Sequence, residues 1–504
     1  MGVGVSRPRW LATLLAVVAT GLVVAAPAAA APTDENIPTS DAIAGVEEYL
    51  RKQQDEHRIP GLAYAIVGRD RVIGQAAWGI DGQGAAVTGQ TPFLIGSVSK
   101  PFTALAVMRL VEAGRVNLDD PVRRHLPWFR LADDDAAGRI TVRQLLTHTS
   151  GLPRWASRTD RFDNTAGGLA RSVRDLATVE PVESPGAAHR YSDANYMVLG
   201  ALVETVTGQP FGGFLRREVF DPLDMRHAAG SEAEAERVGL SAGHRYWFGH
   251  PRRFDPGYDT SGVPYGYVAA SLDDLTHFVT AQLDGGRYAG TQVLSADGIT
   301  QMHTGQVDTS NSGRYGLGWR DTELEGTDTR VVWHAGATPG YFAHLVLIPG
   351  SGLGVIVLAN SYSLALDSSL ATMGFNIARM AHGETWLSSG ADPLLSAALY
   401  TLLAVVGLLT ITVAWSLVRA VRPRRRAQTE RVRITAVAAW VFGCVALICV
   451  VVAALPAMLG GDLGQALLWT PDIGWTIITI ATLASAVAIV RIGVAVRAIL
   501  AIRR

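Results

Sequence analysis

A serine and a lysine three positions apart, Ser97 and Lys100, are the residues whose types and spacing point most directly to catalysis. If a helix begins here, the two side chains share one face, with Cβ atoms roughly 5–6 Å apart. A hydroxyl needs a neighbouring base or charge to become a nucleophile, and an amine can supply either. Only two of the 44 lysine and arginine residues are lysine, and lysine, unlike arginine, can release its proton in a protein. The spacing therefore indicates a serine activated by lysine.

Three later stretches could bring further polar groups to this serine: residues 141–153, 191–200 and 333–337. The first reads as a short helix that ends in a Gly-Leu-Pro turn. The second starts a helix, with Asp193 as its expected N-cap. The third ends a strand. These stretches contain the other side chains whose types could take part in the chemistry.

Together these segments resemble a known family. The motifs Ser-Val-Ser-Lys, Leu-Leu-Thr-His-Thr-Ser-Gly-Leu-Pro, Tyr-Ser-Asp-Ala-Asn-Tyr and His-Ala-Gly occur in the order seen in serine hydrolases related to class C β-lactamases. That family includes penicillin-binding D-Ala-D-Ala carboxypeptidases, D-amino-acid peptidases and esterases. The resemblance covers about residues 41–382. It implies hydrolysis through an acyl-serine intermediate, with no metal and no cofactor.

The resemblance also implies a role for each motif residue. Ser97 would be the nucleophile, and Lys100 and Tyr191 would share the work of the general base. The backbone N–H groups of Ser97 and Ala337, beside Gly336, would form an oxyanion hole. One such donor is typically worth about 3–4 kcal/mol.

Two positions depart from the β-lactamase pattern. Asp193 stands where those enzymes have asparagine, and His334 stands where they have a strand lysine. A carboxylate near Lys100 would favour its ammonium, which would in turn lower the pKa of Tyr191, so we favour Tyr191 as the proton acceptor. A neutral imidazole would bind a substrate carboxylate poorly. Both changes argue against efficient β-lactam hydrolysis and leave peptide, ester or amide hydrolysis open.

Structural roles are the alternative for three of these side chains. Tyr191 could be a core tyrosine with a satisfied hydroxyl, and His334 could be a structural histidine. We interpret His148 as structural, with hydrogen bonds inside its own loop.

The hydrophobic pattern predicts an α+β fold. Apolar stretches separated by turn residues predict strands at both ends of the soluble part, and the middle is mostly helical. The expected strands cover residues 62–67, 71–78, 315–320, 329–334, 341–348 and 354–360, and the expected flanking helices cover 41–57 and 364–381. The simplest arrangement is one antiparallel sheet flanked by helices, with an inserted helical lobe, as in the β-lactamase/transpeptidase fold.

The N-terminal end contains one short apolar segment, and the C-terminal end contains three long ones. Residues 1–31 resemble a signal peptide with a small-residue cleavage site, with an uncleaved anchor as the alternative. Residues 32–392 would form the hydrolase domain and its linker. Residues 393–504 contain three predicted transmembrane helices, which are listed by their expected limits: about 393–418, 434–459 and 473–490.

Arginine placement predicts how the chain lies in the membrane. The segment between the first two spans contains seven arginines, and basic segments stay in the cytoplasm. We therefore expect a multi-pass protein of the cell membrane whose catalytic domain is extracytoplasmic.

Composition limits which partners and metal sites are expected. The net charge of −1 gives no reason to expect nucleic acid as a partner. The only cysteines, Cys444 and Cys449, lie in an apolar run, and no His-Glu-x-x-His spacing occurs, so no metal site is expected. The expected partners are a small-molecule or peptide substrate, with cell-wall peptides among the candidates, and the lipid bilayer. The alternatives are a β-lactamase and, from another class, a non-catalytic sensor of cell-wall ligands.

Overall fold

The computed structural model describes residues 38–154, 159–310, 313–388, 390, 393–421, 430–458 and 461–502. The expected signal peptide, residues 1–31, lies outside the described residues.

An eight-stranded sheet, in which every neighbouring pair is antiparallel, forms the centre of the hydrolase part. Its strand order is β2-β1-β14-β13-β12-β11-β10-β9, so strands from both ends of the domain meet at the β1–β14 pair. The strands are β1 (Gly61–Val67), β2 (Val72–Gly79), β9 (Val307–Thr309), β10 (Gly313–Tyr315), β11 (Arg320–Glu323), β12 (Arg330–Thr338), β13 (Tyr341–Ile348) and β14 (Leu353–Ala359). The predicted sheet, built from both ends of the domain, is confirmed.

The predicted strand at residues 315–320 is not observed as one strand. Residues 315–320 were expected to form a strand, but only Tyr315 and Arg320 belong to strands, and the residues between them connect β10 to β11. Gly318 has a φ of 84°, a conformation in which glycine is favoured, and it bends the chain between the two strands. This bend brings Arg320 back beside Trp333 in the neighbouring strand.

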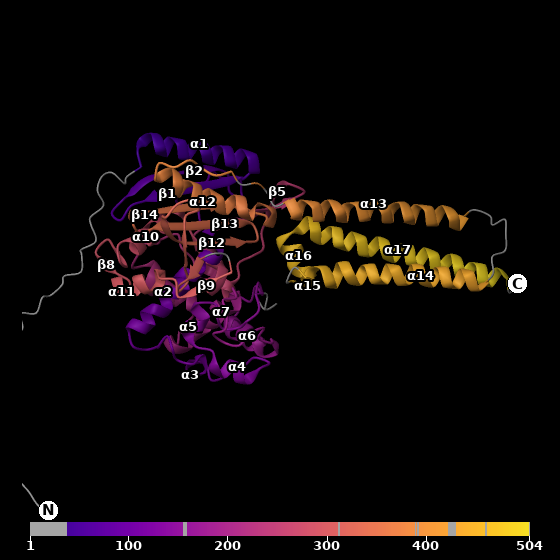
Figure 1. Cartoon of the computed structure of the whole chain (residues 1–504), viewed down its shortest axis with the longest axis horizontal. Coiled ribbons are helices and arrows are strands. Elements are labelled where there is room, and N and C mark those ends of the chain that lie inside the picture. The colour runs from indigo at the N-terminus through magenta and orange to yellow at the C-terminus, as the bar shows by residue number, and fades with distance from the viewer. Residues whose placement is uncertain are drawn as a thin grey trace, which may run out of the picture. The chain divides into compact units, whose positions relative to one another are not determined.

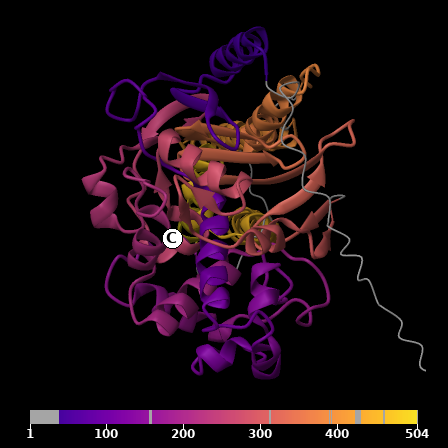
Figure 2. The same ribbon diagram turned by 90° about the vertical axis from the view of Figure 1, so that its left-hand side faces the viewer.

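Helices cover both faces of the sheet (Figures 1 and 2). Helices α1 (Ser40–His57) and α12 (Asp367–Ala381) pack on one face, and α2 (Ser99–Glu112) and α10 (Leu272–Leu283) belong to the core on the other. Strands β1, β13 and β14 are buried along their whole length, because helices lie on both of their faces. Burial of apolar surface stabilises the fold by roughly 25 cal/mol per Å², and it is the main contribution that holds these layers together.

The helical lobe lies between β3 (Phe93–Leu94) and β4 (Gly243–Trp247) in the sequence. It contains α3 (Val122–His125), α4 (Asp134–Arg139), α5 (Val142–Leu146), α6 (Gly168–Arg174), α7 (Asp193–Thr207), α8 (Phe211–Leu215) and α9 (Glu232–Arg237). The remaining elements of the hydrolase part are β5 (His250–Phe254), β6 (Ala269–Ala270), β7 (Arg287–Tyr288), β8 (Thr291–Gln292), β15 (Ser361–Tyr362) and α11 (Ala296–His303). The lobe's core is continuous with the α2 side of the sheet.

Three helices near the C-terminus are long and apolar enough to cross a membrane: Pro393–Val421, Ile434–Ala457 and Pro471–Arg497. They belong to α13 (Pro393–Val421), α14 (Glu430–Cys449) with its continuation into α15 (Leu455–Met458), and α17 (Pro471–Ile502). The third helix is longer than the predicted 473–490. A short helix, α16 (Leu463–Trp469), occupies the connection between the last two, where only a loop was expected.

Candidate active site

Ser97 lies in a tight helical turn, Gly96–Val98, that leads directly into α2. This turn touches strand β12 at two glycines. A Cβ on Gly96, whose φ is 54°, would lie 2.3 Å from the Ala337 nitrogen, and a Cβ on Gly336 would lie 2.5 Å from the Ser97 nitrogen. Because both residues are glycine, no side chain separates the turn from the strand. The backbone nitrogens of Ser97 and Ala337 therefore both lie at this contact.

Lys100 follows one turn later and is completely buried. Its Nζ atom is 2.8 Å from Ser97 Oγ, 2.8 Å from the Tyr265 carbonyl oxygen and 2.6 Å from Asp193 Oδ1. The first two contacts are hydrogen bonds donated by the lysine, and the third is an ion pair. The structure therefore brings together the serine, the lysine and the carboxylate that the sequence singled out.

Tyr191 lies on the other side of the nucleophile. Its side chain lines the same cleft as Ser97, which is near enough to influence the pKa of the phenol. Its ring centroid lies 4.8 Å from Lys100 Nζ. Burial raises the pKa of Tyr191 well above its ordinary value, and the nearby Asp193 carboxylate raises it further. The expectation of a lowered pKa for Tyr191 is therefore wrong, because burial and the Asp193 carboxylate both raise it. Tyr191 is a neutral phenol in this site.

Asp193 is the first residue of α7 rather than its N-cap, so that prediction is also wrong. Ser192 occupies the N-cap position, with extended backbone angles. The carboxylate of Asp193 points instead to Lys100, as the expected electrostatic effect requires.

His148 supports Tyr191 from behind. The two ring centroids are 4.3 Å apart. The Nδ1 atom of His148 accepts hydrogen bonds from the Ser192 backbone N–H at 3.2 Å and from Asn195 Nδ2 at 3.0 Å. Its partners therefore lie at the start of α7 and not within its own loop, as the sequence had suggested. Burial lowers the pKa of His148 well below its ordinary value, so it is a neutral structural group.

His334 is also neutral, and its protons can be assigned from its hydrogen bonds. Nδ1 lies 2.7 Å from the Ala335 carbonyl oxygen and must donate to it, so Nε2 accepts from the Tyr315 hydroxyl at 3.1 Å. Burial, Lys100 and Arg320 all lower the pKa of His334. This side chain consequently supplies no cation, and it acts as a support that orients Tyr315.

Arg320 is the site residue that the sequence reasoning missed. Its guanidinium carbon lies 5.2 Å from the ring centroid of Trp333 and 5.7 Å from those of Tyr191 and Tyr315. It lines the same cleft as Ser97, and it makes no ion pair with the described residues. The chain contains 42 arginines, and no motif distinguishes Arg320 from the others. It reaches Tyr191 only through the bend after β10, which the sequence does not show.

The rim of the cleft contains a buried carboxyl group, Asp160. Its Oδ1 atom accepts from the Tyr267 hydroxyl at 2.8 Å, and its backbone N–H donates to the Tyr265 hydroxyl at 2.8 Å. Burial raises the pKa of Asp160 to about 6. The contacts of Asp160 therefore tie the rim to the segment whose Tyr265 carbonyl accepts from Lys100.

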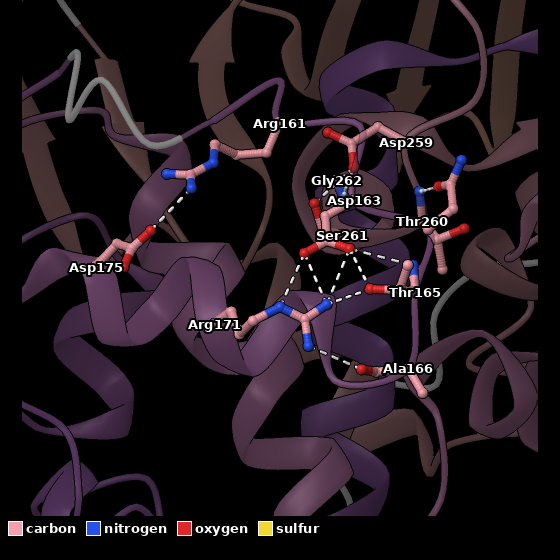
Figure 3. A network of polar contacts seen from close by, with 11 residues as sticks. Arg161, Asp163, Thr165, Ala166, Arg171, Asp175, Asp259, Thr260, Ser261 and Gly262 are labelled. Carbon is pink, nitrogen blue, oxygen red and sulfur yellow. Dashed lines mark hydrogen bonds and ion pairs between the residues drawn. The ribbon is translucent and has the colours of Figure 1, made fainter.

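Two hydrogen-bond networks hold this rim in place (Figure 3). Arg171 in α6 donates to the Asp163 carboxylate at 2.8 Å. Asp259 accepts from the Ser261 hydroxyl at 2.6 Å and from the Gly262 N–H at 3.0 Å. The first network fixes the residues after Asp160, and the second fixes the start of the turn Val263–Tyr267.

The cleft has a volume of about 640 Å³ and is lined by Ser97, Tyr191, Asp193, Arg320 and Ala337, among others. Within the part of the chain that the structure describes, no group of three or more histidine, cysteine, aspartate or glutamate side chains could hold a metal ion. The chemistry available in the cleft is that of a hydroxyl flanked by an ammonium and a phenol.

Comparisons with known proteins show the family of this chain. The model of the Beta-lactamase family matches residues 46–372. Penicillin-binding protein 4 of Amycolatopsis lactamdurans is 35% identical over 326 residues, which cover 62% of this chain and 84% of that protein. Protein flp of Staphylococcus aureus (strain N315) is 26% identical over 325 residues, 64% of each chain.

The fold is also found among solved structures. The octameric penicillin-binding protein homologue from Pyrococcus abyssi superimposes with a TM-score of 0.58 at 23% identity, and the match covers 68% of this chain and 78% of that one. This likeness concerns the fold alone. With the family match over residues 46–372 and the 35% identity to a penicillin-binding protein, the chain belongs to the Beta-lactamase family of serine hydrolases.

Proposed function

We propose that this protein hydrolyses a peptide, ester or amide bond through an acyl intermediate on Ser97. The observation that carries the proposal is the position of Ser97 Oγ, which is 2.8 Å from Lys100 Nζ in a cleft that Tyr191 also lines. The lysine ammonium stabilises negative charge on the oxygen, and the phenol exchanges its proton. Asp193 holds the lysine in place through the 2.6 Å ion pair.

The raised pKa of Tyr191 determines how the proton moves. A resting phenolate is excluded by burial, but a phenol oxygen can accept one proton while it donates another. In the proposed step, Ser97 Oγ attacks the carbonyl carbon, and its proton passes to Tyr191 Oη while the proton already on Tyr191 passes to the leaving nitrogen or oxygen. The bond between the carbonyl carbon and that atom then breaks. Water then reverses the path and releases the acyl group.

The backbone nitrogens of Ser97 and Ala337 are the proposed oxyanion hole. The close contact between the Ser97 turn and β12 at Gly96 and Gly336 supports this role. Fixed backbone donors stabilise the charge that develops on the carbonyl oxygen at no cost of reorganisation.

Arg320 is the proposed binding site for a carboxylate on the leaving group. Its position against the Tyr191 ring supports this, because Tyr191 must reach the leaving group to protonate it. Guanidinium groups bind carboxylates through two parallel hydrogen bonds. A peptide with a free C-terminal carboxylate fits this arrangement, and the similarity to a protein named for penicillin binding supports it.

The proposed location is the outer face of the cell membrane, with helices α13, α14–α15 and α17 as spans. The arginine-rich segment between the first two spans supports this orientation.

A hydrolysis panel tests the proposal. Purified full-length protein is assayed with D-Ala-D-Ala peptides, short esters and a chromogenic cephalosporin, beside Ser97→Ala and the control Ser184→Ala, an exposed serine in a loop. We expect turnover of a peptide or ester by the wild type and the control, and none by Ser97→Ala. Binding of wall peptides without turnover would contradict the proposal and favour a sensor, and turnover of the cephalosporin alone would favour a β-lactamase.

A further inference from the structure

The short helix α16 contacts the hydrolase part of the chain. The guanidinium of Arg245 in β4 donates from Nη1 to the carbonyl oxygens of Leu467 at 2.8 Å and Leu468 at 2.7 Å. These carbonyls lie at the C-terminal end of α16, where a cation is favoured. The arginine therefore anchors the end of this helix.

An aromatic contact and a second hydrogen bond lie beside the anchor. The ring of Trp469 meets the ring of Tyr362 edge-on, with centroids 5.8 Å apart. The Phe248 backbone N–H donates to Asp472 Oδ2 at 3.4 Å, in the first turn of α17. These contacts join α16 and the start of α17 to β4, β15 and the β4–β5 turn.

The N-terminal half of α16 faces the cleft. Asp462 caps the helix by accepting from the Gln465 N–H at 2.9 Å, which fixes the position of Gln465. The side chains of Gln465 and Asp160 line the same cleft, so the start of α16 lies at the rim that Asp160 belongs to. Gln465, Ala466 and Trp469 line the same 640 Å³ cleft as Ser97.

We infer that α16 is a wall of the substrate cleft, and that Gln465 limits how far an acyl group on Ser97 can extend. This inference rests on the proposed acylation of Ser97. It assigns the membrane part of the chain a role in substrate selection besides anchoring. Small acyl groups fit without touching α16, and bulky ones reach it.

Cross-linking tests whether α16 lies at the rim, without relying on catalysis. In full-length protein carrying Cys444→Ala and Cys449→Ala, the pair Asp160→Cys and Gln465→Cys is treated with a short bifunctional thiosulfonate. The control pair, Asp70→Cys and Gln465→Cys, uses an exposed residue of the β1–β2 turn. We expect an intramolecular cross-link in the first pair and none in the second. Equal cross-linking of both pairs, or of neither, would overturn the inference.

Protection from alkylation tests the limit on acyl size. The single variant Gln465→Cys, in the same cysteine-free background, is first labelled with an ethyl fluorophosphonate or a fluorophosphonate carrying a bulky fluorophore. The rate of alkylation by N-ethylmaleimide is then measured, together with the extent of labelling on Ser97. We expect the bulky label to slow alkylation at least fivefold and the small label to change it less than twofold, whereas Asp70→Cys is unaffected by both.

The two failures are distinguishable in this assay. Complete labelling of Ser97 by the bulky reagent with an unchanged alkylation rate would overturn the role of α16 and leave the hydrolase proposal intact. Absence of labelling on Ser97 would overturn the hydrolase proposal, and the inference that depends on it, even if the cross-link had formed.

Discussion

Gly336→Ala is the substitution for which the structure gives the sharpest expectation. An added Cβ at this position would lie 2.2 Å from the Ile95 carbonyl oxygen and 2.5 Å from the Ser97 nitrogen. Ordinary van der Waals contact begins at about 3.4 Å, so strand β12 and the Ser97 turn must separate by roughly 1 Å. Both obstructing atoms are backbone atoms, which cannot rotate out of the way.

The size of the effect follows from that separation. Oxyanion-hole donors act at about 2.7–3.1 Å from the developing charge, and loss of one donor costs roughly 10²–10³ in kcat. Overpacking of this kind costs a further 1–3 kcal/mol of stability, on the order of other small-to-large core changes. We therefore expect Gly336→Ala to fold, with a lower thermal midpoint, and to lose at least a hundredfold in turnover.

The assay compares kcat for a short ester and the rate of fluorophosphonate labelling. The matched control is Gly350→Ala, since a Cβ at Gly350 would meet no atom within 4 Å. We expect the control to keep the activity and thermal midpoint of the wild type. A folded Gly336→Ala protein with turnover within threefold of the wild type would refute the reasoning, because the strand could not then carry a donor that the reaction needs.

The remaining predictions concern individual side chains of the cleft. Tyr191→Phe should lower kcat by about 10²–10⁴, the usual contribution of a general acid–base group, with little change in KM; an unchanged kcat would remove Tyr191 from the proton path. Arg320→Ala should raise KM at least tenfold for a peptide with a C-terminal carboxylate but not for a neutral ester, as kinetics with the two substrates will show; equal changes for both would contradict a carboxylate site. Because burial raises the pKa of Asp160 to about 6, ionisation of this carboxyl destabilises the folded state as the pH rises from 4 to above 6. Asp160→Asn should therefore gain up to roughly 2 kcal/mol relative to the wild type between pH 4.5 and 8 in denaturant titrations, and a difference independent of pH would contradict this assignment.

Much of the hydrolase part could be predicted from local pattern. The hairpin β1–β2 and the strands β13 and β14 are apolar runs bounded by turn residues, and they occur where expected. These strands depend on neighbouring residues, which a sequence shows directly. The meeting of Ser97, Lys100, Tyr191 and Asp193 was instead expected from the resemblance of the ordered motifs to a known family.

The features that were missed depend on contacts between distant segments. The raised pKa of Tyr191 comes mainly from burial, which the motif does not reveal, and next from the Asp193 carboxylate. Arg320 reaches the site through the bend at Gly318, and the hydrogen bond to Ala335 determines which nitrogen of His334 carries the proton. The connection between the last two spans was interpreted as a loop, although Asp462 caps a short helix there.

The most direct test of the proposed mechanism is to identify the residue that becomes covalently labelled. Full-length protein is treated with a fluorescent fluorophosphonate or penicillin, digested, and the modified peptide is sequenced by mass spectrometry, with Ser97→Ala and Lys100→Ala in parallel. The account predicts a single adduct on Ser97 in the wild type, none in Ser97→Ala, and at least a hundredfold slower labelling in Lys100→Ala. An adduct on another residue, or no adduct where an active relative is labelled under the same conditions, would contradict it.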